Sequence, residues 1–262
     1  MATWGSLPVQ RGGRAIARHS PPRRASAGTI AAALILAALS LLAAGSPALG
    51  TAEAVRVTAG PRSTHAVALT FDDGYRRSAC AAIARTLRAY GATGTFFVNG
   101  VHLAAAPAAW RDILAGQQIG NHTRSHLRLT KQSDRVVRRQ IAQDEALHER
   151  ILGRPMLKVL RPPYGAQDAR VRRIAGELGY SRTVLWSVDT RDWQRSATVH
   201  SIIDRATGAP PGSIILMHCG PEETPRALAS IIAHYQARGI TLAGLDVVLG
   251  LAETAAADTA PG

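Results

Sequence analysis

Two adjacent carboxylates stand at the end of an apolar run, in the stretch Thr70-Phe71-Asp72-Asp73-Gly74. The preceding Ala66-Val67-Ala68-Leu69 is typical of a short buried strand, and Gly74 permits a sharp turn. Neighbouring side chains on an extended chain point in opposite directions. One aspartate could therefore bind a metal ion while the other faces a reacting water. Side-by-side carboxylates are costly to bury without a cation. The alternative is a solvated turn, because Asp-Gly is a common turn pair.

A pair of histidines follows in His122-Thr123-Arg124-Ser125-His126. Residues four apart meet on one face of a helical turn. With Asp73 they would give two imidazoles and one carboxylate and leave positions open for water and substrate, as catalytic zinc requires. A histidine pair alone is more often structural or exposed, but its coupling to the paired aspartates favours a metal site. Arg124 and Arg128 would repel a cation, so we expect them to point outward.

A proline-rich stretch, Arg161-Pro162-Pro163-Tyr164-Gly165, comes after another apolar segment. The prolines fix the backbone and remove two N–H donors. The N–H of Tyr164 remains and could face a developing oxyanion, while Arg161 could hold a carboxylate with two hydrogen bonds. The alternative is a rigid loop with a surface arginine.

Two further stretches combine acids, an aromatic ring and a histidine. In Asp189-Thr190-Arg191-Asp192-Trp193, a carboxylate beside an indole suits a sugar site, although a buried ring with solvated aspartates is the alternative. The apolar strand Ile214-Ile215-Leu216-Met217 ends in His218. Such a histidine is usually a satisfied core residue, but at the same end of the sheet as the other motifs it could be a general acid.

Strand-like and helix-like segments alternate along the chain from about residue 55. The expected strands are residues 66–71, 94–98, 118–121, 158–160, 183–188, 213–217 and 241–242. The expected helices are residues 76–90, 107–114, 133–152, 168–178, 199–206 and 224–237, with a short helix after the last strand. This alternation predicts an α/β fold, a parallel sheet with helices outside, either open or closed into a barrel. In a barrel the chemistry lies at the carboxyl ends of the strands, where the polar motifs fall.

Together these five stretches resemble, in order and spacing, the motifs of the polysaccharide deacetylase family, also called the NodB homology domain or carbohydrate esterase family four. The resemblance covers about residues 65 to 250 and implies a distorted (β/α) barrel with about seven parallel strands. One departure is Tyr75, where many members have proline. It concerns the shape of a loop and leaves the ligand set intact.

The resemblance also implies a role for each motif residue. Asp72 would be the general base, and Asp73, His122 and His126 would bind the metal. Arg161 would orient Asp72, and the backbone N–H of Tyr164 would stabilise the oxyanion. Asp192, which we favour over Asp189 because it adjoins Trp193, would support the general acid His218. Leu216 and Trp193 would line the pocket for the acetyl methyl group.

The activity implied is that of a metal-dependent hydrolase, with Zn²⁺ or alternatively Co²⁺ or Ni²⁺. It would remove acetyl groups from N-acetylated amino sugars of an extracellular or cell-wall polysaccharide, such as peptidoglycan or a chitin-like oligomer. An O-deacetylase resembling acetylxylan esterases is the alternative enzyme. A noncatalytic glycan-binding protein on the same fold is the third reading, but its signature would be a lost ligand or base, and none is lost here.

The first 54 residues are predicted to be an export leader. They contain five arginines and an apolar run at residues 30–44, and small residues follow Pro47. A cleaved signal peptide is favoured over an N-terminal membrane anchor. We expect residues 55–252 to form the deacetylase domain and residues 253–262 a flexible tail.

The charge and the cysteine content of the sequence limit which partners and which cellular compartment we expect. The formal net charge of the 262 residues is +13. No basic block contains interleaved aromatics, so we expect no nucleic-acid partner, and association with an anionic cell wall or membrane surface suits the charge better. The protein is expected to be a monomer. Cys80 and Cys219 could form one disulfide or remain two buried thiols.

Overall fold

The computed structural model describes residues 53–251. The predicted leader, apart from its last two residues, and the whole predicted tail lie outside the described residues. Within residues 53–251, no helix has both the length and the apolar character needed to cross a membrane.

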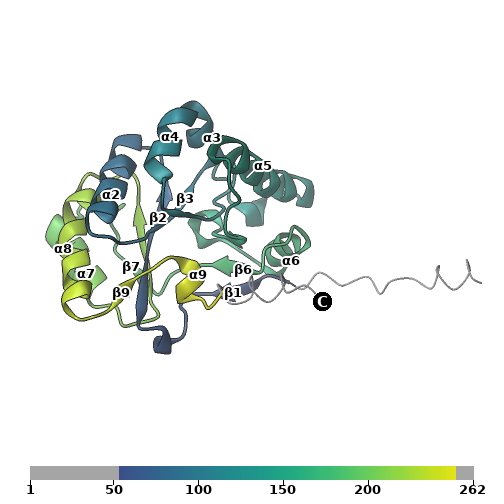
Figure 1. Ribbon diagram of the computed structural model, residues 1–262. Coiled ribbons are helices and arrows are strands. Elements are labelled where there is room, and N and C mark those ends of the chain that lie inside the picture. The colour runs from purple at the N-terminus through teal and green to yellow at the C-terminus, as the bar shows by residue number, and fades with distance from the viewer. Residues whose placement is uncertain (1–52, 252–262) are drawn as a thin grey trace, which may run out of the picture. The chain divides into compact units, whose positions relative to one another are not determined.

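The central element is strand β2, Ala66–Asp73, which lies in the middle of the larger sheet (Figure 1). The order of that sheet is β4-β3-β2-β8-β7, and β9 also pairs with β2. The other strands of this sheet are β3 Thr95–Val98, β4 Gln118–Ile119, β7 Val188–Asp189, β8 Ile214–His218 and β9 Thr241–Leu242. All of these pairings are parallel. Residues 66–72 of β2 are all buried, as expected for a parallel strand covered on both faces.

A smaller parallel sheet continues the first. It has the order β1-β6-β5, with β1 Val55–Val57, β6 Arg182–Val184 and β5 Val159–Leu160. A parallel bridge between Asn121 and Leu160 joins the end of β4 to β5. The strands therefore follow one another from β7 through β2 to β1, and the ladders among the described residues leave the ring open between β1 and β7. The predicted α/β class with parallel strands is confirmed.

The expected strand at residues 183–188 is wrong as a single element. Its first part is β6 of the small sheet and its last residue begins β7 of the large sheet. The chain crosses between the sheets at Trp186: Leu185 N–H donates to Val57 O at 2.8 Å, and Ser187 N–H donates to Ile214 O at 3.0 Å. The continuous apolar pattern hides this change of partner.

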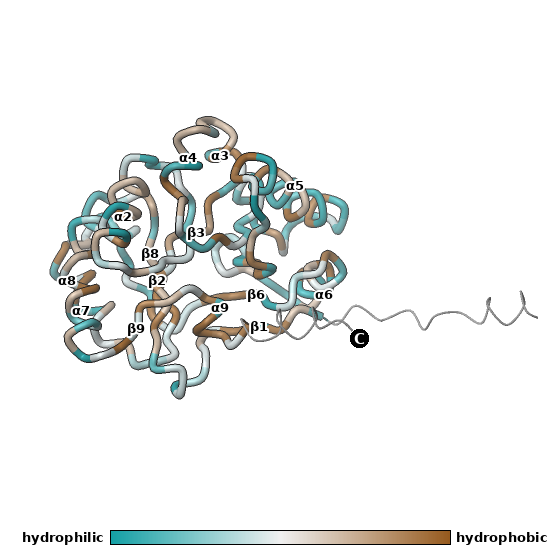
Figure 2. The backbone as a smooth tube through the Cα atoms, viewed as in Figure 1, coloured by the Kyte–Doolittle hydropathy of each residue, from teal (hydrophilic) through white to brown (hydrophobic). Residues whose placement is uncertain are grey.

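Helices surround the strands, close to the predicted bounds. They are α2 Arg77–Ala89, α3 Gly100–Ala105, α4 Pro107–Leu114, α5 Asp134–Leu152, α6 Ala169–Glu177, α7 Val199–Thr207, α8 Glu223–Ala237 and α9 Leu245–Val248. Short 3₁₀ turns lie at Arg62–Thr64, Leu129–Lys131 and Pro163–Gly165. The tube of α5 alternates between hydrophilic and hydrophobic residues, as one face packs inward (Figure 2). Strand β1 and helix α3 were not predicted.

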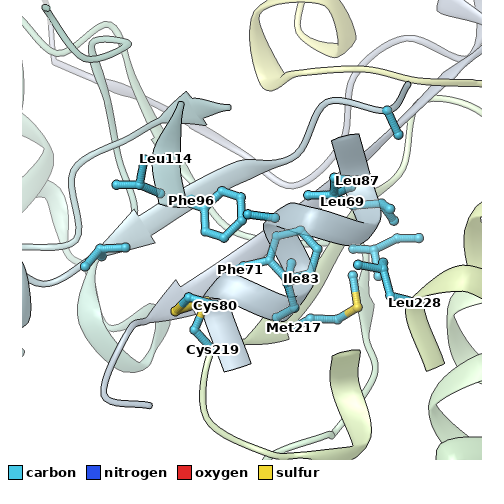
Figure 3. Close-up of a cluster of buried hydrophobic side chains, with 14 of the residues drawn as sticks. Leu69, Phe71, Cys80, Ile83, Leu87, Phe96, Leu114, Met217, Cys219 and Leu228 are labelled. Carbon is cyan, nitrogen blue, oxygen red and sulfur yellow. A yellow bond between two sulfur atoms is a disulfide. The ribbon is translucent and has the colours of Figure 1, made fainter. Parts of the chain in front are cut away.

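A disulfide joins Cys80 of α2 to Cys219, the residue directly after β8, and settles the question that the sequence left open. The bridge lies beside Phe71, Ile83 and Met217 in the main hydrophobic cluster (Figure 3). It ties the first turn of α2 to the loop that follows β8, beside the site described next.

Candidate active site

The site lies at the carboxyl ends of the strands, where parallel pairing brings distant residues together. In the register of β2 with β8, Asp72 lies opposite His218. A pocket of about 470 Å³ opens above them. Its lining residues are Asp72, Asp73, Tyr75, His122, His126, Tyr164, Gly165, Trp186, Asp189, Trp193, Leu216 and His218.

Three potential metal ligands converge on one side of the pocket. The Nε2 atoms of His122 and His126 lie 3.4 and 3.3 Å from Oδ1 of Asp73. The ligand atoms of the three residues all lie within 4.8 Å of one another. Two imidazole nitrogens and one carboxylate oxygen, with one side open to a pocket, are a donor set that suits a catalytic divalent ion.

The orientation of His122 fits this role. Its Nδ1 lies 2.7 Å from the carbonyl oxygen of Arg161, which can only accept a hydrogen bond. The proton of the neutral ring therefore sits on Nδ1, and the lone pair of Nε2 faces the cluster. This hydrogen bond fixes the orientation of the ring, as is usual for a histidine that binds a metal ion.

The electrostatics of the cluster also favour a cation at its centre. Burial raises the pKa of the Asp73 carboxyl, but the hydrogen bond with His122 and the charges of the nearby imidazoles outweigh it and lower the pKa to about 2. Burial lowers the pKa of His122, but Asp72 and Asp73 outweigh it and raise the pKa. At His126, burial and the charge of His122 prevail and lower the pKa. The negative charges of Asp72 and Asp73 therefore favour a positive charge in the space between Asp73, His122 and His126.

The loop that carries both histidines is fixed by buried polar side chains. Nδ2 of Asn99, directly after β3, donates to the carbonyl oxygens of His122 and Thr123 at 2.7 and 3.2 Å. Oδ2 of Asp144 accepts from the backbone N–H of His122 at 3.2 Å. Burial raises the pKa of Asp144 to about 6. These contacts hold the loop in a shape with left-handed backbone at Thr123 (φ 68°) and His126 (φ 57°).

Asp72 lines the same pocket as Asp73 and is held by a buried arginine. Nη1 of Arg161 donates to Oδ1 of Asp72 at 2.7 Å and to the hydroxyl of Thr70 at 2.8 Å. The guanidinium is fully buried and lies over the ring of Phe97, 4.2 Å from its centroid. Oδ2 of Asp72 lies 3.8 Å from Nε2 of His122. One carboxylate oxygen is therefore fixed while the other faces the ligand cluster.

His218 is held by Asp192 on the opposite side of the pocket. Its Nδ1 lies 2.7 Å from Oδ1 of Asp192, and its backbone N–H donates to Oδ2 of the same residue at 2.7 Å. The hydroxyl of Thr224 also donates to that Oδ2, at 2.7 Å. Burial lowers the pKa of His218, but the hydrogen bond and charge of Asp192, with Asp72 and Asp73 behind it, raise the pKa to about 9. The imidazole is thus protonated at neutral pH and can give up a proton.

Apolar and aromatic side chains form the remaining walls. Leu216 is almost fully buried at the base, whereas Tyr164 and Trp193 are more than half exposed at the rim. The guanidinium of Arg128 lies over the Tyr164 ring, 4.5 Å from its centroid, so this arginine faces the rim and not the ligand cluster. Tyr164 has a left-handed backbone, with φ 61°.

The structure brings together all ten residues that the sequence singled out: Asp72, Asp73, His122, His126, Arg161, Tyr164, Asp192, Trp193, Leu216 and His218. Asp189 lines the pocket too, but its Oδ1 accepts from the backbone N–H of Arg191, and Asp192 occupies the place beside His218.

Sequence reasoning missed the residues that hold these groups in place, namely Asn99, Asp144 and Thr224. Asn99 could have been found, because it follows an apolar strand as Asp72 does. Asp144 and Thr224 lie within helices, where nothing in the local pattern distinguishes them from surface polar residues.

Comparison with known proteins finds deacetylases among the relatives of this chain. A family model described as polysaccharide deacetylase matches residues 59–183. A chitooligosaccharide deacetylase of Azorhizobium caulinodans is 35% identical over 205 residues, which cover 72% of this chain and 96% of that protein. A peptidoglycan-N-acetylglucosamine deacetylase of Bacillus cereus is 34% identical over 186 residues, covering 68% of this chain and 85% of that one.

A solved structure shares the fold. The crystal structure of the Bc1960 peptidoglycan N-acetylglucosamine deacetylase superposes with a TM-score of 0.70 at 32% identity, covering 76% of this chain and 94% of the other. The similarity therefore extends over nearly the full length of several relatives. The chain belongs to the polysaccharide deacetylase family and is a hydrolase that acts on carbon–nitrogen bonds other than peptide bonds.

Proposed function

We propose that this protein is a metal-dependent deacetylase that hydrolyses the acetamide of N-acetylated amino sugars in an extracellular or cell-wall polysaccharide. The observation that carries the proposal is the placement of Asp72 and His218 opposite each other on β2 and β8, beside the Asp73–His122–His126 cluster. A carboxylate on one side and a protonated imidazole on the other are the groups that hydrolysis of an amide needs. The named substrates of the relatives, chitooligosaccharide and peptidoglycan, support the choice of glycan.

Asp73, His122 and His126 would hold the metal ion, which we propose to be Zn²⁺, with Co²⁺ or Ni²⁺ as ions that suit the same donors. When bound, such an ion lowers the pKa of a coordinated water and polarises a carbonyl oxygen.

Two side chains of the protein then carry out the two proton transfers. Asp72, steadied by Arg161, accepts the proton of the attacking water on its unpaired oxygen. His218, kept protonated by Asp192, donates a proton to the leaving amine nitrogen, so that acetate and a free amino sugar are released. The backbone N–H of Tyr164 would donate to the developing oxyanion. Leu216 and Trp193 would enclose the acetyl methyl group.

We also propose that the protein is exported and acts at the cell envelope as a monomer, with residues 1–54 as the leader, cleaved rather than retained as an anchor, and residues 55–252 as the catalytic domain. The Cys80–Cys219 disulfide supports export, because disulfides persist in oxidising compartments. Without that leader, 26 basic and 17 acidic side chains remain, and their formal net charge of +9 suits an anionic wall polymer.

The test is acetate release from N-acetylglucosamine oligomers, peptidoglycan and acetylated xylan, measured side by side on zinc-loaded protein. We expect release from the amide substrates and its loss after chelation, restored by added Zn²⁺. Faster release from acetylated xylan would make the enzyme an O-deacetylase instead. No release from any substrate would favour a glycan-binding protein on the same fold.

A further inference from the structure

Asp189 lines the catalytic pocket, yet the proposed reaction gives its carboxylate no role. Asp189 is the last residue of β7 and lies opposite Leu216 in the register of β7 with β8. The same strand β8 ends in His218, the proposed acid. The carboxylate therefore belongs to the wall that also carries the proposed acetyl pocket and the proposed proton donor.

The turn that follows β7 holds this carboxylate in place. Oδ1 of Asp189 accepts from the backbone N–H of Arg191 at 2.7 Å, where the backbone of Arg191 is left-handed with φ 55°. Thr190 between them is fully buried, and its N–H and hydroxyl both donate to Leu216 O, at 3.3 and 2.8 Å. Nη1 of Arg205 donates to the carbonyl oxygen of Thr190 at 3.1 Å. Oδ2 of Asp189 is left free, because no hydrogen bond or ion pair within residues 53–251 involves it.

The charge of Asp189 has no counterpart in the part of the chain that the structure describes. The other carboxylates of the site each have a cationic or metal-binding partner, and these pairs are Asp72 with Arg161, Asp73 with His122 and His126, and Asp192 with His218. Arg128 at the rim lies over the ring of Tyr164 and does not line the pocket. Solvent screens a half-buried charge less than an exposed one, so Asp189 makes this wall of the pocket negative.

We propose that Asp189 is a specificity-determining residue, whose free oxygen accepts a hydrogen bond from a hydroxyl of an uncharged acetamido sugar and whose charge excludes an acetamido sugar that carries a carboxylate. The lactyl ether of N-acetylmuramic acid is such a carboxylate. The setting fits this role, because a few fixed polar groups among apolar and aromatic walls, here Trp186, Trp193 and Leu216, determine orientation and specificity in ligand pockets. A fixed like charge is also a common means of rejecting the wrong partner. This inference rests on the proposed function and adds to it which sugar of an alternating glycan loses its acetyl group.

The test uses one substrate that offers both sugars, a peptide-free peptidoglycan fragment in which N-acetylglucosamine and N-acetylmuramic acid alternate. The zinc-loaded full chain acts on it, and tandem mass spectrometry measures the deacetylated units of each kind. We expect a large excess of deacetylated glucosamine units in the natural sequence. In Asp189→Asn the excess should fall by about tenfold, which corresponds to a repulsion of about 1.4 kcal/mol. The amide oxygen can still accept from Arg191, so the turn is kept.

Methyl esterification of the lactyl carboxylate separates its charge from its bulk and needs no variant of the protein. In the natural sequence, the muramic units of the ester should be deacetylated about tenfold faster than those of the free acid. In Asp189→Asn the ester and the acid should react alike. An ester that the natural sequence deacetylates as slowly as the acid would show exclusion by size and would overturn the inference.

Asp204→Asn is the matched control, because it removes the same charge from an exposed position on α7 that does not line the pocket. This variant should keep the natural ratio of the two products. Equal ratios in Asp189→Asn and Asp204→Asn would also overturn the inference. Thermal melting of each variant checks that it folds.

A binding measurement separates this inference from the proposed function. Calorimetric titration should show that the natural sequence binds an N-acetylglucosamine oligomer more tightly than the alternating fragment, and Asp189→Asn should reduce this difference by about tenfold. If the protein released no acetate yet showed this reduction, the proposed function would fail and the selection by Asp189 would stand. An affinity difference unchanged in Asp189→Asn, with acetate still released, would remove the selection alone.

Discussion

The two sides of the site that we propose to handle protons, Asp72 as the base and His218 as the acid, are held in opposite ways. On the base side, Asp72 has one oxygen tied to Arg161 at 2.7 Å and the other no closer than 3.8 Å to His122. On the acid side, both oxygens of Asp192 are taken, by the ring and backbone of His218 and by the hydroxyl of Thr224. A proton acceptor needs a free oxygen, whereas a proton donor needs a fully occupied partner that keeps it charged.

The buried partners of the two groups have opposite charges, because each partner stabilises the charge that the group needs for its role. A fully buried guanidinium stands behind the base, and a carboxylate that is 1% exposed stands behind the acid. The β2–β8 register, with Asp72 opposite His218, sets the separation between the two groups. Four substitutions test this division, one partner at a time.

Asp72→Asn should have the largest effect. The amide can still accept from Arg161 but cannot take a proton, so kcat should fall by about 10²- to 10⁴-fold while bound zinc, measured by elemental analysis, stays at the natural level. Asp204→Asn on the exposed face of α7 is a control that should keep its activity. Near-normal turnover in Asp72→Asn would remove Asp72 as the base.

Arg161→Met should cost the most stability. It leaves the carboxylate of Asp72 buried without its cation, and breaking a buried ion pair costs about 3 to 5 kcal/mol of unfolding free energy. Denaturant unfolding measures this loss, and the exposed Arg195→Met should change the value by less than about 0.5 kcal/mol. Equal midpoints for the two variants would show that Arg161 does not anchor the base side.

Asp192→Asn should shift the pH profile. His218 is an effective acid only below its pKa, so activity is expected to fall as pH rises through about 9. Without the negative partner the pKa drops, and the alkaline limb of kcat should move to lower pH by about one to three units. The measurement is kcat against pH, and an unmoved alkaline limb would show that another group supplies the proton.

Thr224→Val should have the smallest effect, because it removes one of the two donors to Oδ2 of Asp192 and keeps the side-chain shape. We expect a loss of about 1 kcal/mol in unfolding free energy and a smaller shift of the alkaline limb than in Asp192→Asn. In the Asp192→Asn background the same substitution should cost less, since the two residues are in contact. Fully additive costs would argue against the coupled acid side.

Much of the fold follows from local sequence pattern. The apolar run at residues 66–71 predicted β2, and the helices expected at residues 107–114 and 133–152 correspond to α4 and α5. Strand β1 and helix α3 escaped prediction, because they are short and depend on distant partners: Val55 pairs with Arg182, and Val101 N–H donates to Arg124 O. In such short segments, intrinsic secondary-structure propensity has less influence on the backbone than hydrogen bonds to distant parts of the chain.

The site divides in a similar way. The candidate catalytic and metal-binding residues at strand ends could be predicted from the sequence, because their types and their place after apolar runs are local features. Their supports could not, since the contact of Thr224 with Asp192 depends on how separate loops meet.

The left-handed backbone at the pocket has a consequence for thermostabilisation. Five of the six non-glycine residues with positive φ in the described chain lie in the pocket loops: Asp73, Thr123, His126, Tyr164 and Arg191. Each such conformation costs about 1 to 3 kcal/mol, which glycine would relieve. A selection for heat resistance alone would therefore favour glycine at the positions of two proposed metal ligands, Asp73 and His126, and would trade turnover for melting temperature. Screens for robust variants of this enzyme should hold these loops constant and vary the outer helices.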